Sequence, residues 1–298
     1  MKTLSINEFE VLVVIEKSKK ELSQREISKL SKLSLGTVNK TILLLLSKKY
    51  IDEQNMITEK GLKALEPYKV KRAIFLAAGF GSRMVPITLN TPKPLVLVNG
   101  KKIIETLLDA VIKAQIPEII IVTGYLKDQF EILLKKYPNV KLVYNDKYNE
   151  MNNISSAYAV KDYFQNSYVL ESDLVLYNQD IIRKYEYRSN FLGKKVDVTD
   201  DWCLETKNGV ITKEKQGGYN CYQMYGISYY DEKDGKQIAK DIDKVFNMPG
   251  GKEKYWEQVM LDVFKNNYNI FVRECQDGDI IEIDSFKELK EIDKTYDV

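Results

Sequence analysis

The 298-residue chain contains no histidine. A Ser-His or Cys-His nucleophile therefore cannot be built, and neither can a zinc or iron centre with histidine ligands. The chemistry has to rest on Asp, Glu, Lys, Arg and Tyr side chains and on any bound metal. These groups suit phosphoryl or nucleotidyl transfer, in which positioning and charge neutralisation supply most of the catalysis.

Cysteine is also scarce. The three cysteines, Cys203, Cys221 and Cys275, are far apart and form no CxxC pair, so they indicate neither a disulfide framework nor a zinc site. The formal net charge is only +2, which gives no strong attraction to nucleic acid or membrane. No segment is apolar for the length of a membrane helix, and acidic residues interrupt the apolar positions at the N-terminus. The composition favours a cytoplasmic enzyme of two domains and leaves a homodimer open.

The most informative segment is the stretch 76–95, LAAGFGSRMVPITLNTPKPL, which follows a short apolar run at 70–75. The run predicts a buried parallel strand. Small residues follow it, and their backbone amides can approach a polyphosphate closely. Arg83 and Lys93 add two cations to the same loop. We expect the triphosphate to be held by Leu76, Ala77, Ala78, Gly79, Gly81 and Ser82.

This string resembles the signature LAAGxGxRxxPxTxxxPKxL of the nucleotidyltransferases that make sugar and alcohol nucleotides, and every fixed position is present. It is not a Walker loop, because no Gly-Lys-Ser/Thr follows. It is not the dinucleotide fingerprint either, because position 84 is Met where a third glycine is needed. The resemblance implies transfer of a nucleotide with release of pyrophosphate.

From residue 70 onward, strand and helix patterns alternate, which predicts a Rossmann-like α/β nucleotidyltransferase fold with a mainly parallel mixed sheet. Ligands bind beyond the carboxyl ends of such strands, where the glycine loop, Gly124 and Asp173 all lie. The strands are expected at 70–75, 118–123, 141–144 and 168–170, and the helices at 103–114, 126–137 and 155–164.

Asp173 follows a buried strand directly, as a metal ligand does in the superfamily that the signature resembles. The segment 280–285, IIEIDS, reads as a strand on which Glu282 and Asp284 share one face. One or both can therefore meet Asp173. We expect Asp173 and Asp284 to hold Mg²⁺, and Glu282 remains an alternative.

Several further strings resemble the bacterial CTP:phosphocholine cytidylyltransferases, which activate phosphocholine for decoration of cell-surface glycans. They are VTGYLKDQF at 122–130, YNDKY at 144–148, NN at 152–153, NSYV at 166–169, YW at 255–256 and EIDS at 282–285. The resemblance covers about residues 70–292, with Glu171 in place of an expected aspartate. It implies CTP and phosphocholine as substrates. A sugar 1-phosphate is the rival acceptor within the same superfamily.

The resemblance also implies roles for single residues. Lys93 is expected between the donor and acceptor phosphates, with Arg83 neutralising the β- and γ-phosphates. Gly124 is expected beside the nucleotide, while Asn153 and Ser155 are candidates for reading the cytosine edge, because amides and hydroxyls supply mixed donors and acceptors.

A trimethylammonium head donates no hydrogen bonds, and proteins hold it with aromatic faces and a nearby carboxylate. The chain has only two tryptophans, and each adjoins an acid, in Asp201-Trp202 and Trp256-Glu257. With Tyr255 they predict a choline cage of Asp201, Trp202, Tyr255 and Trp256. The alternative is that these aromatic residues belong to the core and to strand faces.

Residues 1–68 predict a separate small α+β domain, followed by a catalytic domain over 69–298. The order of three helix patterns and a short wing-like segment resembles the winged helix-turn-helix of bacterial repressors. Its third helix would expose Thr37, Asn39 and Lys40, on the face that enters the major groove when such domains bind DNA. Operator binding and a dimerisation or docking role both remain open. Under operator binding, the protein could be a transcription regulator whose second domain senses a nucleotide or choline.

Overall fold

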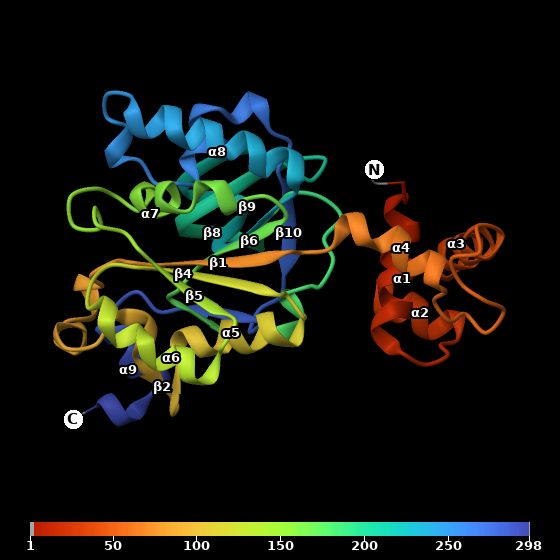
Figure 1. Ribbon diagram of the computed structural model, residues 1–298, viewed down its shortest axis with the longest axis horizontal. Helices are drawn as coiled ribbons and strands as arrows, with labels where there is room; N and C mark the ends of the chain where they lie inside the picture. The colour runs from red at the N-terminus through yellow and green to blue at the C-terminus, as the bar shows by residue number, and fades with distance from the viewer. Residues whose placement is uncertain (1–2, 298) are drawn as a thin grey trace. The chain divides into compact units, whose positions relative to one another are not determined.

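The computed structural model describes residues 3–297. The chain forms two compact units, one of Met1–Lys69 with Tyr185–Tyr187 and one of Val70–Lys184 with Arg188–Val298 (Figure 1). Within residues 3–297, no helix is long and apolar enough to cross a membrane.

The N-terminal unit is built from short capped helices. Hydroxyl side chains of Ser5, Ser23, Ser34 and Thr58 accept a backbone N–H in the first turn of each, which satisfies a donor that the helix leaves free. The predicted two-stranded wing is reduced to one antiparallel bridge between Ile51 and Ile57. The helices are α1 (Ile6–Ser18), α2 (Gln24–Ser31), α3 (Leu35–Ser47) and α4 (Glu59–Leu65).

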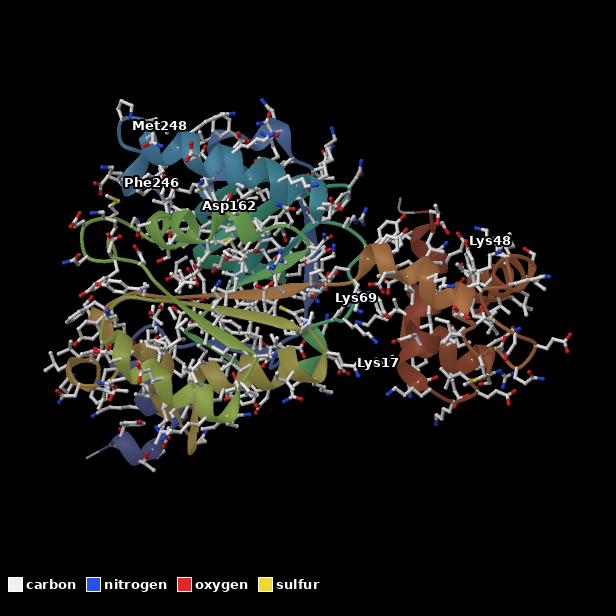
Figure 2. All side chains as sticks on the ribbon, viewed as in Figure 1. Lys17, Lys48, Lys69, Asp162, Phe246 and Met248 are labelled. Carbon is white, nitrogen blue, oxygen red and sulfur yellow. The ribbon has the colours of Figure 1, made fainter. Side chains whose placement is uncertain are left out.

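The core of this unit contains a segment from much later in the chain. The ring of Tyr187 lies 5.3 Å from that of Phe9 and 5.5 Å from that of Tyr68, centroid to centroid. The Tyr187 hydroxyl donates to the Leu4 carbonyl at 3.0 Å, and the Glu186 N–H donates to the Tyr68 carbonyl at 2.9 Å. At the far end of α3, Lys48, which is labelled in Figure 2, pairs with the buried Glu8. The N-terminal unit is therefore completed by residues that follow a large part of the second unit.

The second unit is centred on a seven-stranded sheet of order β10-β8-β9-β6-β1-β4-β5. Four neighbouring strands, β6, β1, β4 and β5, run parallel, whereas β9 runs antiparallel to β6. This confirms the predicted mainly parallel mixed sheet. The strands are β1 (Arg72–Ala77), β4 (Glu118–Thr123), β5 (Val140–Tyr144), β6 (Ser167–Glu171), β8 (Asn190–Lys207), β9 (Val210–Tyr230) and β10 (Phe271–Cys275).

Helices cover both faces of the sheet (Figure 1). Side chains of β4 alternate between the two resulting cores, with Ile119 and Ile121 in one and Ile120 and Val122 in the other. Each fully buried side chain of this size contributes about 1.5–3 kcal/mol. The helices are α5 (Ile103–Lys113), α6 (Glu131–Lys136), α7 (Ile154–Ala159) and α8 (Glu232–Asn247). The helix predicted at 126–137 begins as a 3₁₀ turn, and the one at 155–164 ends early, with a 3₁₀ turn after α7.

The sheet is extended by a long antiparallel hairpin of β8 and β9, which we did not predict. Its turn places Asn208 and Gly209 at positive φ, as two-residue hairpin turns require. The pairing shifts register between Thr199 and Trp202 and again after Cys203. These irregularities bend the hairpin close to Trp202, one of the aromatic residues of the predicted choline cage.

A small second sheet brings the C-terminal region to the main sheet. Strand β7 (Leu174–Leu176) pairs antiparallel with β11 (Ile280–Glu282), and α9 (Phe286–Ile292) follows. The strand expected over 280–285 therefore ends at Glu282. Ser285 and Glu288 form a capping box that starts α9, so Asp284 lies in the connection and not on the strand. A further short hairpin joins β2 (Leu97–Val98) and β3 (Lys101–Lys102).

Candidate active site

Lys93 lies between two carboxylates. Its ammonium donates to Asp173 Oδ2 at 2.9 Å and to Asp284 Oδ1 at 3.1 Å, and its side chain is only 11% exposed. Burial by itself lowers the pKa of Lys93, but the charges and hydrogen bonds of Asp173 and Asp284 outweigh it and raise that pKa. Arg83 Nη2 donates to the same Asp284 Oδ1 at 2.7 Å. The structure thus brings four predicted residues together.

The fold positions these groups at the carboxyl ends of neighbouring strands. Asp173 lies in the short connection between β6 and β7, and Glu171, the last residue of β6, is in register with Leu76 near the end of β1. The Ser172 hydroxyl donates to the Leu76 carbonyl at 2.9 Å. The Ile283 N–H donates to the Asp173 carbonyl at 3.0 Å, which fixes the end of β11 against the same point. Three distant parts of the sequence meet here as a result.

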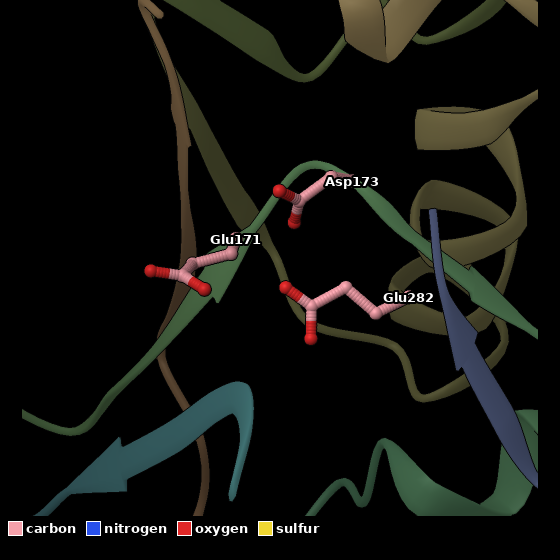
Figure 3. A group of neighbouring side chains, drawn as sticks. All are labelled: Glu171, Asp173 and Glu282. Atoms are coloured by element: carbon pink, nitrogen blue, oxygen red, sulfur yellow. The ribbon is translucent and has the colours of Figure 1, made fainter. Parts of the chain in front are cut away.

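Glu171, Asp173 and Glu282 form a carboxylate cluster, in which one oxygen of each lies within 4.8 Å of the others. Figure 3 shows the three side chains beside one another, from β6, from the turn after it and from β11. Burial, followed by the charge of Asp173, raises the pKa of Glu171 well above its usual value, and the same two causes act on Glu282. The cluster therefore favours a bound cation.

A divalent metal fits this donor set. Carboxylate oxygens are the ligands that Mg²⁺ prefers, and Asp173 Oδ1 is buried without a hydrogen-bond partner among the described residues. The Lys93 ammonium already occupies a cation position between Asp173 and Asp284. Glu282 was predicted only as an alternative ligand, and Glu171 was not among the predicted ligands. Both precede an aspartate by two residues, in Glu-Ser-Asp and Glu-Ile-Asp, and this shared spacing could have identified them.

The glycine loop lies against Lys93 and the end of β4. Gly81 has φ +67°, and a Cβ added there would meet Lys93 Cβ at 3.0 Å. A Cβ at Gly124 would meet the Ala78 carbonyl oxygen at 2.6 Å, so only glycine allows this approach. The Tyr125 N–H donates to the same Ala78 carbonyl at 3.1 Å. The predicted triphosphate loop and Gly124 are therefore neighbours.

The two residues expected to read cytosine are engaged within the protein. Asn153 Oδ1 accepts the Trp256 N–H at 2.9 Å, and its side chain also hydrogen-bonds to Glu257. The Ser155 hydroxyl donates to the Asn152 carbonyl at 2.9 Å. It also accepts from Asn145 Nδ2, again at 2.9 Å. Base recognition by Asn153 and Ser155 stays a prediction, and it requires these bonds to exchange when a nucleotide binds.

The predicted choline cage divides into two parts. The rings of Trp202 and Tyr255 meet edge to face with centroids 5.9 Å apart, and Tyr255 is 40% exposed. Asp201 Oδ1 accepts the Trp202 N–H at 2.7 Å. The predicted place of Trp256 in the cage is wrong. Trp256 is only 1% exposed and packs in the core, so no ring face is left for a ligand. Its ring neighbours are Phe164, Phe191 and Tyr230.

In the N-terminal unit, Asn39 and Lys40 are exposed on α3, whereas Thr37 is half-buried and its hydroxyl bonds to that of Ser34 at 2.8 Å. The same helix also exposes Leu43 (65%) and Leu44 (51%). This surface therefore combines polar groups with large apolar ones.

Comparisons with known proteins show the family to which the chain belongs. Residues 72–220 match the family model described as nucleotidyl transferase. The chain is 37% identical over 232 residues to the 2-aminoethylphosphonate cytidylyltransferase of Lancefieldella rimae, covering 75% of this chain and 92% of that protein. It is 35% identical over 229 residues to the choline-phosphate cytidylyltransferase of Streptococcus pneumoniae, covering 75% and 97%.

The fold is similar to a solved structure as well. The CTP:phosphocholine cytidylyltransferase of Streptococcus pneumoniae superposes with a TM-score of 0.70 at 34% identity, over 76% of this chain and 99% of that one. About a quarter of the present chain lies outside each of these matches.

Proposed function

Because the chain belongs to the nucleotidyl transferase family and to its cytidylyltransferase group, we propose that it transfers a cytidylyl group from CTP to a small acceptor, with release of pyrophosphate. The acceptor carries a phosphate or phosphonate at one end and a cationic amine at the other. The observation that carries the proposal is the position of Lys93, held between Asp173 and Asp284 beside the glycine loop.

The chemistry follows from these charges. The acceptor phosphate or phosphonate is already ionised, so its oxygen attacks the α-phosphorus without a general base. Lys93 lies between donor and acceptor phosphates and holds both anions in line. Arg83 releases its hydrogen bond to Asp284 and binds the β- and γ-phosphates instead. It thereby neutralises the departing pyrophosphate. Asp173 and Asp284 would hold Mg²⁺, with Glu171 and Glu282 close by, and the ion supplies charge neutralisation at the α-phosphate.

Two acceptors are candidates. Phosphocholine is the acceptor that the sequence predicts, and the ring pair of Trp202 and Tyr255 beside Asp201 supports a cationic head group. 2-Aminoethylphosphonate is the second, because one relative of similar identity is named for it and because Trp256 is removed from the cage. Both molecules combine an anionic reacting end with a positive amine.

The proposal is tested by pyrophosphate release. The full-length protein is incubated with Mg²⁺, each of CTP, UTP, dTTP and ATP, and each of phosphocholine, phosphoethanolamine, 2-aminoethylphosphonate and glucose 1-phosphate. We expect CTP with an amine-bearing acceptor to be the fastest pair. A preference for UTP or dTTP with the sugar phosphate would overturn the proposal.

For the N-terminal unit we propose a winged-helix-like binding role. Asn39 and Lys40 support contact with DNA, whereas Leu43 and Leu44 support docking of a protein partner. The test uses the full chain, because Tyr187 belongs to the core of this unit. If DNA is the ligand, affinity falls steeply with salt, and Asn39→Ala and Lys40→Ala weaken it. If the full-length protein binds no DNA at low salt, docking of a protein partner is the role that remains.

A further inference from the structure

The signature loop (residues 78–93) carries both cations of the candidate site, but its outer part is packed loosely. The side chains of Phe80 and Leu89 are exposed. A Cβ added at Gly79 would meet no atom of the described residues within 4 Å, so packing does not hold the backbone there. Because glycine also has more backbone freedom than other residues, the shape of this part of the loop depends on its hydrogen bonds.

The inner part of the loop is fixed within the fold. The hydroxyl of the buried Thr88 donates to the Gly81 carbonyl at 2.9 Å and closes the turn that contains Arg83. Met84 in the same turn is buried in an apolar cluster with Leu289 of α9. These contacts hold residues 81–88 and leave the two ends of the loop to other contacts.

Tyr125 holds both ends, because it contacts the loop at three points. Its backbone N–H donates to the Ala78 carbonyl at 3.1 Å. Its ring lies 4.3 Å from that of Phe80, centroid to centroid. Its hydroxyl donates to the Leu89 carbonyl at 3.0 Å. One residue that follows β4 thus joins the first residue of the signature loop to a residue near its end.

The backbone next to Tyr125 adopts an unfavourable conformation that the fold maintains. Leu126 has φ +48°, and among the described residues it is the only one with an apolar side chain at positive φ. Such a conformation persists only where the surrounding structure holds it, and it is typical of functional segments. The 3₁₀ turn that follows carries Gln129, whose Nε2 donates to the Asn90 carbonyl at 2.8 Å. The same short segment therefore bonds to two consecutive carbonyls at the end of the loop.

We infer that Tyr125 is a positioning residue for the transfer step, because it holds the signature loop in the shape that places Arg83 and Lys93 against the phosphates. This rests on the proposed function. Leu89 lies four residues before Lys93, and Ala78 lies five residues before Arg83. A shift of the loop therefore moves both cations. A displacement of about 1 Å at a reacting centre can lower the rate by about 10².

The first experiment removes the hydrogen bonds at the end of the loop in the full-length protein. Tyr125→Phe keeps the ring and should lower kcat/KM for CTP by about three- to tenfold, as expected for the loss of one hydrogen bond. The double variant Tyr125→Phe/Gln129→Leu frees both carbonyls and should lower it by about 10², mainly through kcat. KM for the acceptor should stay close to the wild-type value, because the residues proposed to bind its amine lie outside the loop.

Tyr296→Phe is the matched control. The Tyr296 hydroxyl also donates to a leucine carbonyl, that of Leu97, at 2.9 Å and on the surface. Its removal costs the protein the same kind of bond without touching the signature loop, so kcat/KM should stay at the wild-type value. Thermal unfolding of all variants separates a change in positioning, which leaves the melting temperature in place, from a general loss of stability.

The second experiment follows the loop without turnover. Trypsin cleaves after Arg83, and because Met84 is buried, cleavage requires the loop to open. The rate is measured by mass spectrometry of the peptide that ends at Arg83. It should rise by about tenfold in the double variant, since the opened population grows when two hydrogen bonds are lost. It should stay at the wild-type value in Tyr296→Phe.

The outcomes separate the inference from the proposed function. Wild-type kcat/KM for CTP in the double variant overturns the inference, as does an equal loss in Tyr296→Phe. In either case, transfer from CTP would still stand. If the wild-type protein cytidylylates no acceptor, the proposed function itself fails. The rate of cleavage after Arg83 then decides whether Tyr125 holds the loop, and an unchanged rate in the double variant overturns the inference.

Discussion

The Lys93 ammonium lies 2.9 Å from the Asp173 carboxylate, and this contact joins the residue expected to hold both phosphates to the residue expected to hold the metal. Asp284 accepts from the same ammonium and from Arg83. In the free protein, the catalytic cations and carboxylates thus neutralise one another. Under the proposed function, nucleotide phosphates and a metal ion take over these pairings when substrate binds.

Lys93→Met should lower kcat by about 10²–10³, because a positive group aimed at the reacting phosphates is removed. It should also lower the melting temperature without added metal, since Asp173 and Asp284 lose their shared cation, and Mg²⁺ should restore part of that loss. Steady-state kinetics and thermal unfolding check both effects. Lys113→Met, which removes an exposed partner of Asp180, is the control that should change neither. Full activity in Lys93→Met would remove the assignment.

Asp173→Asn should abolish most of the activity and weaken metal binding, while the protein stays folded. Mn²⁺ binding followed by electron paramagnetic resonance gives a measure that does not depend on turnover. We expect a smaller loss of activity for Glu282→Gln. Glu282 lies beside Asp173 but does not contact Lys93, which is the residue expected between the two phosphates. Excess EDTA should stop the reaction. Unaltered Mn²⁺ affinity in Asp173→Asn would exclude this residue as a ligand.

Trp202→Leu should raise KM for the amine-bearing acceptor by about tenfold or more and leave KM for CTP unchanged, since a ring face near a desolvated cation contributes about 2 kcal/mol. Trp256→Phe is the comparison. It removes part of a core side chain, so it should lower stability and leave KM for the acceptor close to the wild-type value. If Trp256→Phe alone raises KM for the acceptor, Trp256 belongs to the cage after all.

Glu257 should make the folded protein less stable as the pH rises. Burial, followed by the charge of Glu214, raises its pKa to about 8 in the folded state against 4.5 for an ordinary glutamate, so between these values the folded protein holds a proton that the unfolded chain has released. The free energy of unfolding therefore falls from pH 4.5 to 8, by on the order of a few kcal/mol, and levels off above. Glu214, whose pKa is raised to about 7 mainly by burial, acts in the same direction up to that pH.

Thermal unfolding between pH 5 and 9 measures this effect in the wild type and in Glu257→Gln. The variant should lose much of the slope, because its amide does not titrate. Glu205→Gln, which removes a half-exposed acid paired with Lys215, should keep the wild-type slope. An identical slope in Glu257→Gln would mean that Glu257 is ionised in the folded protein across the whole range.

The repeating part of the fold could be predicted because its signals are local. The apolar run EIIIVT matches β4 at both ends, since a strand buried on both faces has no polar position to obscure it. The signature loop and Asp173 follow such strands, so their convergence was predictable from the parallel order. The role of Glu282 as a metal ligand was harder to predict, because alternating acidic residues on a strand are equally typical of a solvent-facing edge.

The hairpin of β8 and β9 could not be predicted with the same ease. Its strands mix charged, polar and aromatic residues, and its register shifts near Trp202 break the alternation that identifies a strand. Glu214 and Glu257 illustrate the same limit. A lone glutamate in a sequence reads as a surface charge, and only the packing around it reveals that the carboxyl group is buried.

The place of Tyr185–Tyr187 in the N-terminal unit has a consequence for folding order. Domains of a growing chain usually fold as units, with the N-terminal one first. Here the rings of Phe9 and Tyr68 lack their partner until Tyr187 has left the ribosome, after β1, β4, β5 and β6 have all been synthesised. The first unit of the chain to be made is thus completed only when the parallel half of the sheet is present. A nascent chain arrested near residue 100 should therefore show a protease-sensitive N-terminal region, and one arrested well beyond residue 187 should not.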